Sequence, residues 1–349
     1  MSAESAEFHC ARHKHRARRS RSTGGSPAPM AKRILVTAAI YSDSEARKPL
    51  LDAGFELVDS PPDAPFGEDA IIGLLEGCDA VIADSDAYTE RVFAACPQLR
   101  LVSRWGVGVD SIDREAATRH EVMVTNTPGI IRDAVADLAL MFILALARRL
   151  REGDAMMRAG GWGKLVGANV GGATIGIIGM GDIGTCTARR AYGFGMRILA
   201  FDPQPRRHLV DDLGVEFVDL PTLLRESDFV TLHCNATEQN RNLIGSAELQ
   251  LMKPTAFLIN CARGSLVDEG ALVEALQDGS IAGAGLDVYA QEPPDPGSPL
   301  FAMENCLFMP HTATMDYETI AQVSAQVTKS TLDALQGRRP EFLINPEVG

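Results

Sequence analysis

The chain has 349 residues, with 33 Lys and Arg against 46 Asp and Glu and a net charge of -13. This length favours two domains, and the acidic charge argues against a general affinity for nucleic acid or anionic membranes, so we expect a small soluble partner. The most apolar stretch, residues 134–147, is shorter than the roughly 20 residues that a transmembrane helix needs.

The first 30 residues differ from the rest, because they hold six Lys or Arg and only two acids, about +4, which leaves about -17 for the remainder. We expect a disordered basic arm, or an upstream start with Met30 as the true first residue. A targeting peptide and an electrostatic tether stay open as alternatives. Seven cysteines without a CxxC pair or zinc-like spacing predict reduced thiols in a cytoplasmic protein and no metal site.

From residue 32 onward, short apolar runs alternate with helical patterns. The patterns predict strands at 33–40, 55–60, 80–84 and 99–106, and helices at 46–54, 69–77 and 90–97. Such repeated βα units indicate a parallel sheet covered by helices. A long apolar run at 135–150 then predicts one buried helix, ended by charges and Gly153, that links two lobes.

The segment ATIGIIGMGDIG carries Gly179, Gly181 and Gly184 in G-x-G-x-x-G spacing. A strand, a helix and a strand are predicted around it, at 173–178, 183–194 and 197–202. In this context the glycines allow a tight turn, close approach of a pyrophosphate, and packing of helix on strand. Asp202, at the end of the second strand, can bind ribose hydroxyls and would repel a 2′-phosphate. We therefore predict an NAD site.

The segment NCARGSLVDE places Arg263 after an apolar strand predicted at 255–259 and before a helix start at Asp268. Strand ends on the carboxyl side of an open α/β sheet face the ligand crevice, and a guanidinium matches a carboxylate bidentately. Arg263 is thus a candidate for clamping the carboxylate of a 2-keto acid and polarising its carbonyl. The structural alternative is that it caps a carbonyl or pairs with Asp268 or Glu269.

Hydride transfer to a keto acid also needs a proton donor, and two histidines, His233 and His311, end apolar runs. CLFMPHTA makes His311 the better candidate, although an isolated histidine after a strand is often structural. Glu292, in GLDVYAQEPP, can hold its tautomer and favour the imidazolium.

Four motifs in this order and spacing, GMGDIG, NCARGSLVDE, GAGLDVYAQEP and PHTA, resemble those of the NAD-dependent D-2-hydroxyacid dehydrogenases, including the phosphoglycerate dehydrogenase-like branch. The resemblance covers about residues 32–346. It implies an α/β fold of two doubly wound parallel-sheet domains, with a Rossmann cofactor domain inserted in a flavodoxin-like substrate domain. It also implies a homodimer, a substrate domain at 31–126 and 310–349, and an NAD-binding domain at 127–309.

The resemblance further implies a role for each matching position. Arg263, Glu292 and His311 would be catalytic, with His311 donating a proton to the keto oxygen. Backbone around Val107 and Gly108 would hold the substrate carboxylate, beside Arg104 and Arg263. The expected cofactor contacts are Gly179, Gly181, Asp182, Ile183 and Gly184 at the pyrophosphate, Asp202 at the ribose, and Cys261, Arg263, Asp287 and His311 toward the nicotinamide.

The chain departs from the family at three places, of which Asn235 for proline and Asp137 for glutamate look tolerable. At the third, Asp84-Ser85 stands where the phosphoglycerate branch has Arg-Ser for phosphate, although Arg104 and Arg148 remain basic. An acid at position 84 would repel a phosphate. Phosphoglycerate therefore stays a candidate beside hydroxypyruvate, glyoxylate and other simple 2-keto acids.

Two other classes of function stay open. A corepressor-like scaffold could keep NAD binding and these residues while turning over little or no substrate. A nucleic-acid binder would depend on the basic arm alone.

Overall fold

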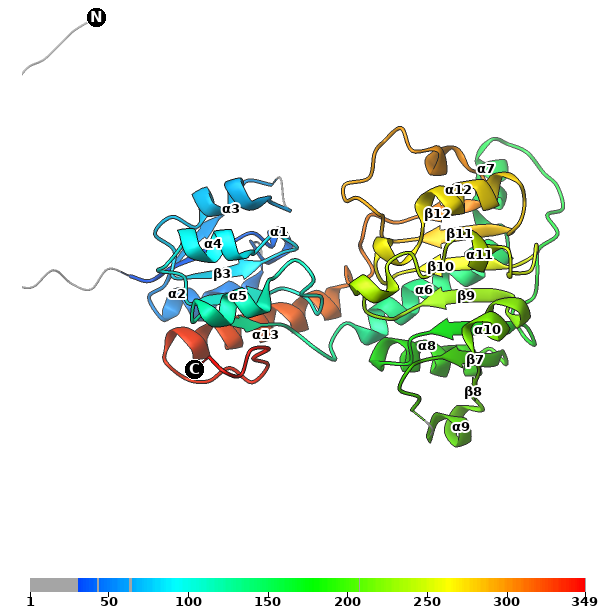
Figure 1. The fold of residues 1–349 in the computed structure, drawn as a ribbon. Coiled ribbons are helices and arrows are strands. Elements are labelled where there is room, and N and C mark those ends of the chain that lie inside the picture. Colours follow the sequence, from blue (N-terminus) through cyan, green and yellow to red (C-terminus); the bar gives the residue numbers. More distant parts are fainter. Residues whose placement is uncertain (1–30, 43, 63–64, 207, 349) are drawn as a thin grey trace, which may run out of the picture. The chain divides into compact units, whose positions relative to one another are not determined.

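The computed structural model describes residues 31–42, 44–62, 65–206 and 208–348, and the predicted basic arm lies outside them. Residues Lys32–Gly349 form one compact unit. Within this unit the chain builds two sheets, one of five strands and one of seven, and all strand pairs are parallel (Figure 1). The α/β class with two parallel sheets is confirmed.

The first sheet has the order β2-β1-β3-β4-β5, which is the flavodoxin-like order. Its strands are β1 (Arg33–Val36), β2 (Glu56–Asp59), β3 (Ala80–Ala83), β4 (Leu101–Arg104) and β5 (Met123–Thr125). The strands β1 and β3 are nearly continuous runs of buried residues, as expected where helices cover both faces of a sheet.

Helices cover both faces of the first sheet, and each face has its own apolar core. One core includes residues of α3 (Glu68–Leu74), α4 (Glu90–Ala95) and α5 (Arg114–Arg119); the other includes residues of α1 (Ala39–Ser42), α2 (Lys48–Asp52) and α13 (Tyr317–Leu335). The C-terminal helix α13, orange to red in Figure 1, thus packs on strands from the start of the chain. Asn345 anchors the C-terminal segment to the first sheet, because its Oδ1 accepts a hydrogen bond from the amide of Val124 over 2.9 Å.

The second sheet has the order β12-β11-β10-β9-β6-β7-β8. From the central strand β6 the chain first adds β7 and β8 on one side, and the strand order then reverses as β9 to β12 are added on the other side. Its strands are β6 (Thr174–Ile178), β7 (Arg197–Phe201), β8 (Glu216–Phe217), β9 (Phe229–Leu232), β10 (Phe257–Asn260), β11 (Gly283–Leu286) and β12 (Cys306–Phe308). This is the order of a dinucleotide-binding sheet extended by one strand, and the reversal creates the crevice at which such sheets bind ligands.

The second sheet is also covered on both faces. One core includes residues of α6 (Arg132–Ala147), α8 (Asp182–Gly193) and α9 (His208–Leu213); the other includes residues of α10 (Leu220–Glu226), α11 (Ser246–Leu249) and α12 (Glu269–Gln277). Helix α6 is buried almost all round because it packs against β10, β11 and α8. None of the described helices is both long and apolar enough to cross a membrane.

Two element predictions were wrong. The single helix predicted through Leu150 is broken into α6 and α7 (Leu150–Arg158), because Arg149 has a left-handed backbone with φ of 51°. The strand predicted at 33–40 ends at Val36, because the amides of Thr37 and Ala38 both turn to the carbonyl of Ile82.

Candidate active site

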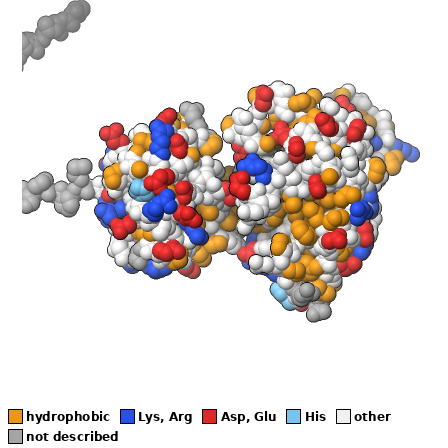
Figure 2. All heavy atoms as spheres, in the orientation of Figure 1, with side chains coloured by type: hydrophobic (Ala, Val, Ile, Leu, Met, Phe, Trp, Pro, Cys, Tyr) orange, Lys and Arg blue, Asp and Glu red, His pale blue; other side chains and the backbone are white. Residues whose placement is uncertain are grey.

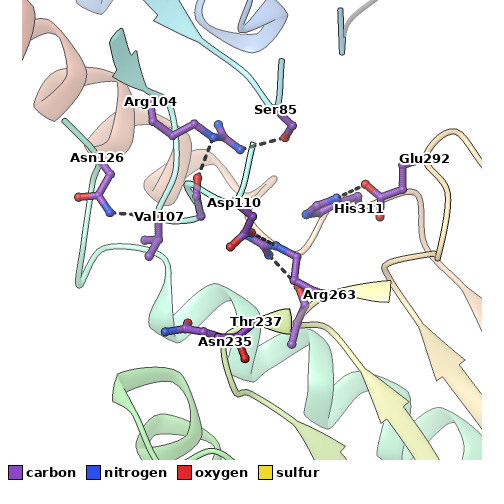
Figure 3. Close-up of polar contacts among 12 residues, drawn as sticks. Ser85, Arg104, Val107, Asp110, Asn126, Asn235, Thr237, Arg263, Glu292 and His311 are labelled. Atoms are coloured by element: carbon purple, nitrogen blue, oxygen red, sulfur yellow. Dashed lines mark hydrogen bonds and ion pairs between the residues drawn. The ribbon is translucent and has the colours of Figure 1, made fainter. Parts of the chain in front are cut away.

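The predicted site residues follow the carboxyl ends of strands from both sheets. Arg104 ends β4, Arg263 lies three residues after β10, Glu292 follows β11 and His311 follows β12. They line a pocket of about 400 Å³ together with Val107, Gly108, Asp84, Ser85 and Tyr289. Figure 3 shows the guanidinium of Arg263 and the imidazole of His311 in this common region. The structure therefore gathers the residues that the sequence proposes as catalytic.

Arg263 is held by Asp110 rather than by the acids next to it in sequence. Its Nε donates to Asp110 Oδ2 over 2.6 Å and its Nη1 donates to the carbonyl of Ala262 over 2.7 Å (Figure 3). Asp268 caps α12 instead by accepting from the amide of Ala271. Nη2 has no hydrogen-bond partner in the described part of the chain. It lies so close to Gly108 that a Cβ built on this glycine would be only 1.6 Å from Nη2. An edge of the guanidinium thus remains available to a ligand.

His311 and Glu292 form an acid–imidazole pair. His311 Nδ1 lies 2.7 Å from Glu292 Oε2, and Glu292 Oε1 accepts from the amide of Tyr289 over 3.0 Å. Burial opposes the charge of Glu292, but the hydrogen bond and charge of His311, the Tyr289 amide and the charge of Arg263 lower its pKa overall. The pair therefore favours a carboxylate beside an imidazole whose other nitrogen stays open to the pocket.

The backbone of His311 is strained, with φ of 54° in the left-handed region that side chains other than glycine rarely adopt. Its amide donates to the carbonyl of Asp287 over 2.8 Å. The left-handed backbone and the contact with Asp287 fix the direction in which the imidazole leaves the main chain, which fits a positioned proton carrier.

Arg104 organises the loop that follows β4. Its side chain is only 11% exposed, and it donates to the carbonyls of Trp105 and Gly108. It also donates to Ser85 Oγ, as Figure 3 shows. Burial lowers the pKa of this guanidinium. Because most of its N–H groups bind protein acceptors, the sequence-based assignment of Arg104 as a direct substrate contact stays a prediction.

Other groups fasten the remaining carbonyls of the same loop. Asn126 Nδ2 donates to the carbonyl of Val107 over 2.8 Å, and the amide of Thr127 donates to that of Gly106 over 3.0 Å. Among the described residues, the amides of Val107 and Gly108 donate to no acceptor. With its carbonyls bound behind it, this loop offers free N–H groups, an arrangement that suits an anion.

The glycine motif has the geometry that its spacing predicts. Gly179 has φ of 95° and a Cβ there would lie 2.5 Å from the amide of Cys234, whereas a Cβ at Gly184 would lie 2.0 Å from the carbonyl of Gly179. A Cβ at Gly181 would meet nothing, and no side chain caps α8, whose first turn begins at Asp182 and Ile183. The helix thus presents uncapped N–H groups to open space, which fits a pyrophosphate.

Two carboxylates flank the places where the rest of a dinucleotide would lie. Asp202 follows β7 and accepts from the amides of Met180 and Gln204, each over 2.7 Å, which holds its carboxylate beside the glycine turn. Asp287 is fully buried and accepts from the amides of Thr312 and Ala313, next to His311. Burial raises the pKa of Asp287 and also that of the neighbouring Cys261 thiol. The free N–H groups at the glycine motif and these carboxylates together fit NAD.

Sequence reasoning missed two residues that position Arg263. Asp110 is 153 positions away, so that only the folded chain reveals the pair. Asn260 is buried and ties the loop by accepting from the amide of Ala262 and donating to the carbonyl of Arg263. Its place as the last residue of a buried strand was the signal that could have identified it.

Several other residues lie outside the catalytic group. His233 is buried between the hydroxyls of Thr187 and Thr231, and burial lowers its pKa to about 3, so it stays neutral. Arg148 is exposed at the end of α6 and does not line the pocket of Arg263. The preference for His311 over His233 therefore agrees with the geometry.

Two of the departures from the family pattern lie in ordinary local contacts. The backbone carbonyl of Asn235 accepts from Asn240 Nδ2 over 2.7 Å in the turn after β9, a contact that does not depend on the side chain at position 235. Asp137 on α6 pairs with Arg190 on α8. On the face that Figure 2 shows, acidic and basic side chains are interspersed.

Comparisons with known proteins agree on one family. Residues 140–313 match the NAD-binding domain of the D-isomer specific 2-hydroxyacid dehydrogenases. A glyoxylate reductase of Korarchaeum cryptofilum is 42% identical over 91% of this chain and 97% of its own. The solved structure of the TT0316 protein from Thermus thermophilus has a TM-score of 0.82 at 36% identity, over 89% of this chain and 99% of its own.

A solved glyoxylate reductase from Paecilomyes thermophila has a TM-score of 0.79 at 29% identity, over 91% of this chain and 99% of its own. These relatives match about nine tenths of the chain. The chain therefore belongs to the family of NAD-binding D-isomer specific 2-hydroxyacid dehydrogenases.

Proposed function

We propose that this enzyme reduces a small 2-keto acid of the glyoxylate or hydroxypyruvate type with NADH, in a reversible reaction that gives the D-2-hydroxy acid where the product is chiral. The observation that carries the proposal is the convergence of Arg263, Glu292 and His311 on one pocket. The names of the relatives, glyoxylate reductases, support the substrate class.

The substrate carboxylate would be held by the free amides of Val107 and Gly108 and by the open edge of Arg263. Asp110 binds Nε of the guanidinium and so leaves Nη2 to the ligand. A planar, permanently charged donor placed in this way fixes the keto group and stabilises the charge that develops on its oxygen. Positioning and electrostatic stabilisation thus come from the same side chain.

His311 would donate a proton to the keto oxygen from Nε2, while Nδ1 stays on Glu292. The lowered pKa of Glu292 keeps it ionised, so its carboxylate stabilises the positive charge of the imidazolium before transfer, and a proton from solvent replaces the transferred one afterwards. In the reverse direction the neutral imidazole would take the proton from the hydroxyl group.

The cofactor, when bound, supplies the hydride to C2 of the keto acid and recovers it in oxidation. Gly179, Gly181, Gly184, Asp182 and Ile183 would hold its pyrophosphate. Asp202 would accept from the ribose hydroxyls, and the region of Cys261 and Asp287 would face the nicotinamide.

Oxidation of NADH by the purified protein, measured at 340 nm with glyoxylate, hydroxypyruvate, 3-phosphohydroxypyruvate and pyruvate, tests this function. We expect clear turnover of glyoxylate or hydroxypyruvate. Binding of NADH without turnover of any of these acids would contradict the enzyme assignment and favour a scaffold.

We further propose the domain boundaries, the assembly and the location predicted from the sequence. The strands β1–β5 with α13 support a substrate domain at 31–126 and 310–349, and β6–β12 support a cofactor domain at 127–309. The exposed apolar side chains of Met141, Leu150 and Phe194 supply a surface suited to a homodimer. A cytoplasmic location agrees with the cysteine pattern.

A further inference from the structure

Asp84 is a charged residue in the substrate pocket that the proposed mechanism does not use. It follows β3, lines the pocket of about 400 Å³ that also contains Arg263 and His311, and its side chain is 42% exposed. Oδ1 accepts from the amide and the hydroxyl of Ser85, over 2.7 and 3.2 Å. The carboxylate therefore has a defined place on the pocket wall and still faces solvent.

The backbone at Asp84 is fixed by a buried network. Its amide donates to Thr37 Oγ1 over 3.0 Å, and that hydroxyl donates to Asp86. Asp86 is fully buried and also accepts from the amide of Phe66 over 2.9 Å. Because these contacts join β1, β3 and the segment before α3, the backbone that carries Asp84 is held beside the pocket.

The charges around the pocket are matched in pairs. His311 lies 2.7 Å from Glu292, Arg263 lies 2.6 Å from Asp110, and Arg104 lies 3.8 Å from Asp84. Among the described residues that line the pocket, the basic side chains are those of His311, Arg263 and Arg104. Only Arg263 keeps an unpartnered guanidinium nitrogen there, since Arg104 donates from all three nitrogens to Ser85 and to carbonyls.

We propose that Asp84 is a specificity-determining residue that restricts this enzyme to monoanionic 2-keto acids and excludes those with a phosphate or a second carboxylate at the far end. The proposal rests on the proposed function. One carboxylate has Arg263 and the loop amides to receive it, whereas a second anionic group has no unmatched cation.

The size of the pocket makes the repulsion hard to avoid. A sphere of this volume is only about 9 Å across. The far end of a bound acid would therefore lie within about one Debye length of Asp84, about 8 Å at physiological salt, where the repulsion is only partly screened. An uncharged or hydroxylated end meets no such opposition, because Ser85 Oγ and the Asp84 carboxylate can both accept from a hydroxyl group.

The test is the ratio of kcat/KM for 3-phosphohydroxypyruvate to that for hydroxypyruvate, measured with NADH in the wild type, Asp84→Asn and Asp84→Ser. We expect the wild type to prefer hydroxypyruvate, and both variants to raise the ratio at least about tenfold, since a repulsive charge is removed. Asp52→Asn, an exposed charge at the end of α2, is the matched control and should leave the ratio unchanged.

A wild type that uses both acids equally well, or a ratio that Asp84→Asn and Asp84→Ser leave unchanged, would overturn the proposal. Calorimetric titration of glycerate and 3-phosphoglycerate onto the NAD-loaded wild type decides the same question without turnover. Weaker binding of 3-phosphoglycerate than of glycerate supports the exclusion of a second anionic group even if no acid is reduced, and tighter or equal binding refutes it. Failure of this specificity proposal and failure of the proposed dehydrogenase activity are thus distinguishable.

Discussion

At the scale of single residues, the site depends on carboxylates that hold cations in place. Asp110 orients Arg263 and Glu292 orients His311, over 2.6 and 2.7 Å. The sequence predicted the second pair, because both members stand in motifs after neighbouring strands. It could not predict the first, because nothing near Arg263 in the chain shows that Asp110 folds against it.

The activity of Glu292→Gln tests the pair of His311 and Glu292. The uncharged amide offers the imidazolium no charge partner, so kcat/KM for glyoxylate should fall about 100-fold. Glu304→Gln, which removes an exposed carboxylate next to β12, should leave kcat/KM unchanged. Wild-type kcat/KM in Glu292→Gln would show that the carboxylate does not support the proton donor.

The same pair also affects stability in a defined pH range. The pKa of Glu292 is lowered in the folded protein relative to its usual value of 4.5. Its contribution to the free energy of unfolding is therefore fully present above that value and is lost as the pH falls through the folded pKa.

At the scale of elements, the sequence predicted most strands and the glycine turn because their signals are local. The motif from β6 through α8 to β7 ends in Asp202, as its spacing indicates. The break between α6 and α7 escaped prediction, because no glycine or proline marks it and the left-handed turn falls on Arg149. The end of β1 at Val36 also depends on a tertiary contact, the carbonyl of Ile82.

Cofactor choice belongs to this scale, because Asp202 acts from the end of β7. In Asp202→Ala the charge that opposes a 2′-phosphate is gone, so the ratio of kcat/KM with NADPH to that with NADH should rise at least about tenfold. Asp212→Ala, an exposed acid on α9, is the control and should leave the ratio unchanged. An unchanged preference in Asp202→Ala would remove the ribose contact from the account.

At the scale of the whole molecule, alternation of strands and helices predicted parallel pairing, and the family resemblance predicted two such sheets; the structure confirms both. The pairing of groups that lie far apart along the chain, such as Asp110 with Arg263, was beyond prediction because it depends on how loops from both sheets meet. The same holds for Arg104, whose contacts with loop carbonyls appear only in the folded protein.

The most direct test of the central claim is the kcat/KM for glyoxylate of Arg263→Lys beside Arg225→Lys, an exposed position on α10 outside the pocket. A lysine cannot keep both the contact with Asp110 and a second donor toward the substrate, so we expect a loss of about 100-fold or more. Arg225→Lys should keep wild-type activity and NADH affinity. Wild-type turnover in Arg263→Lys would contradict the account.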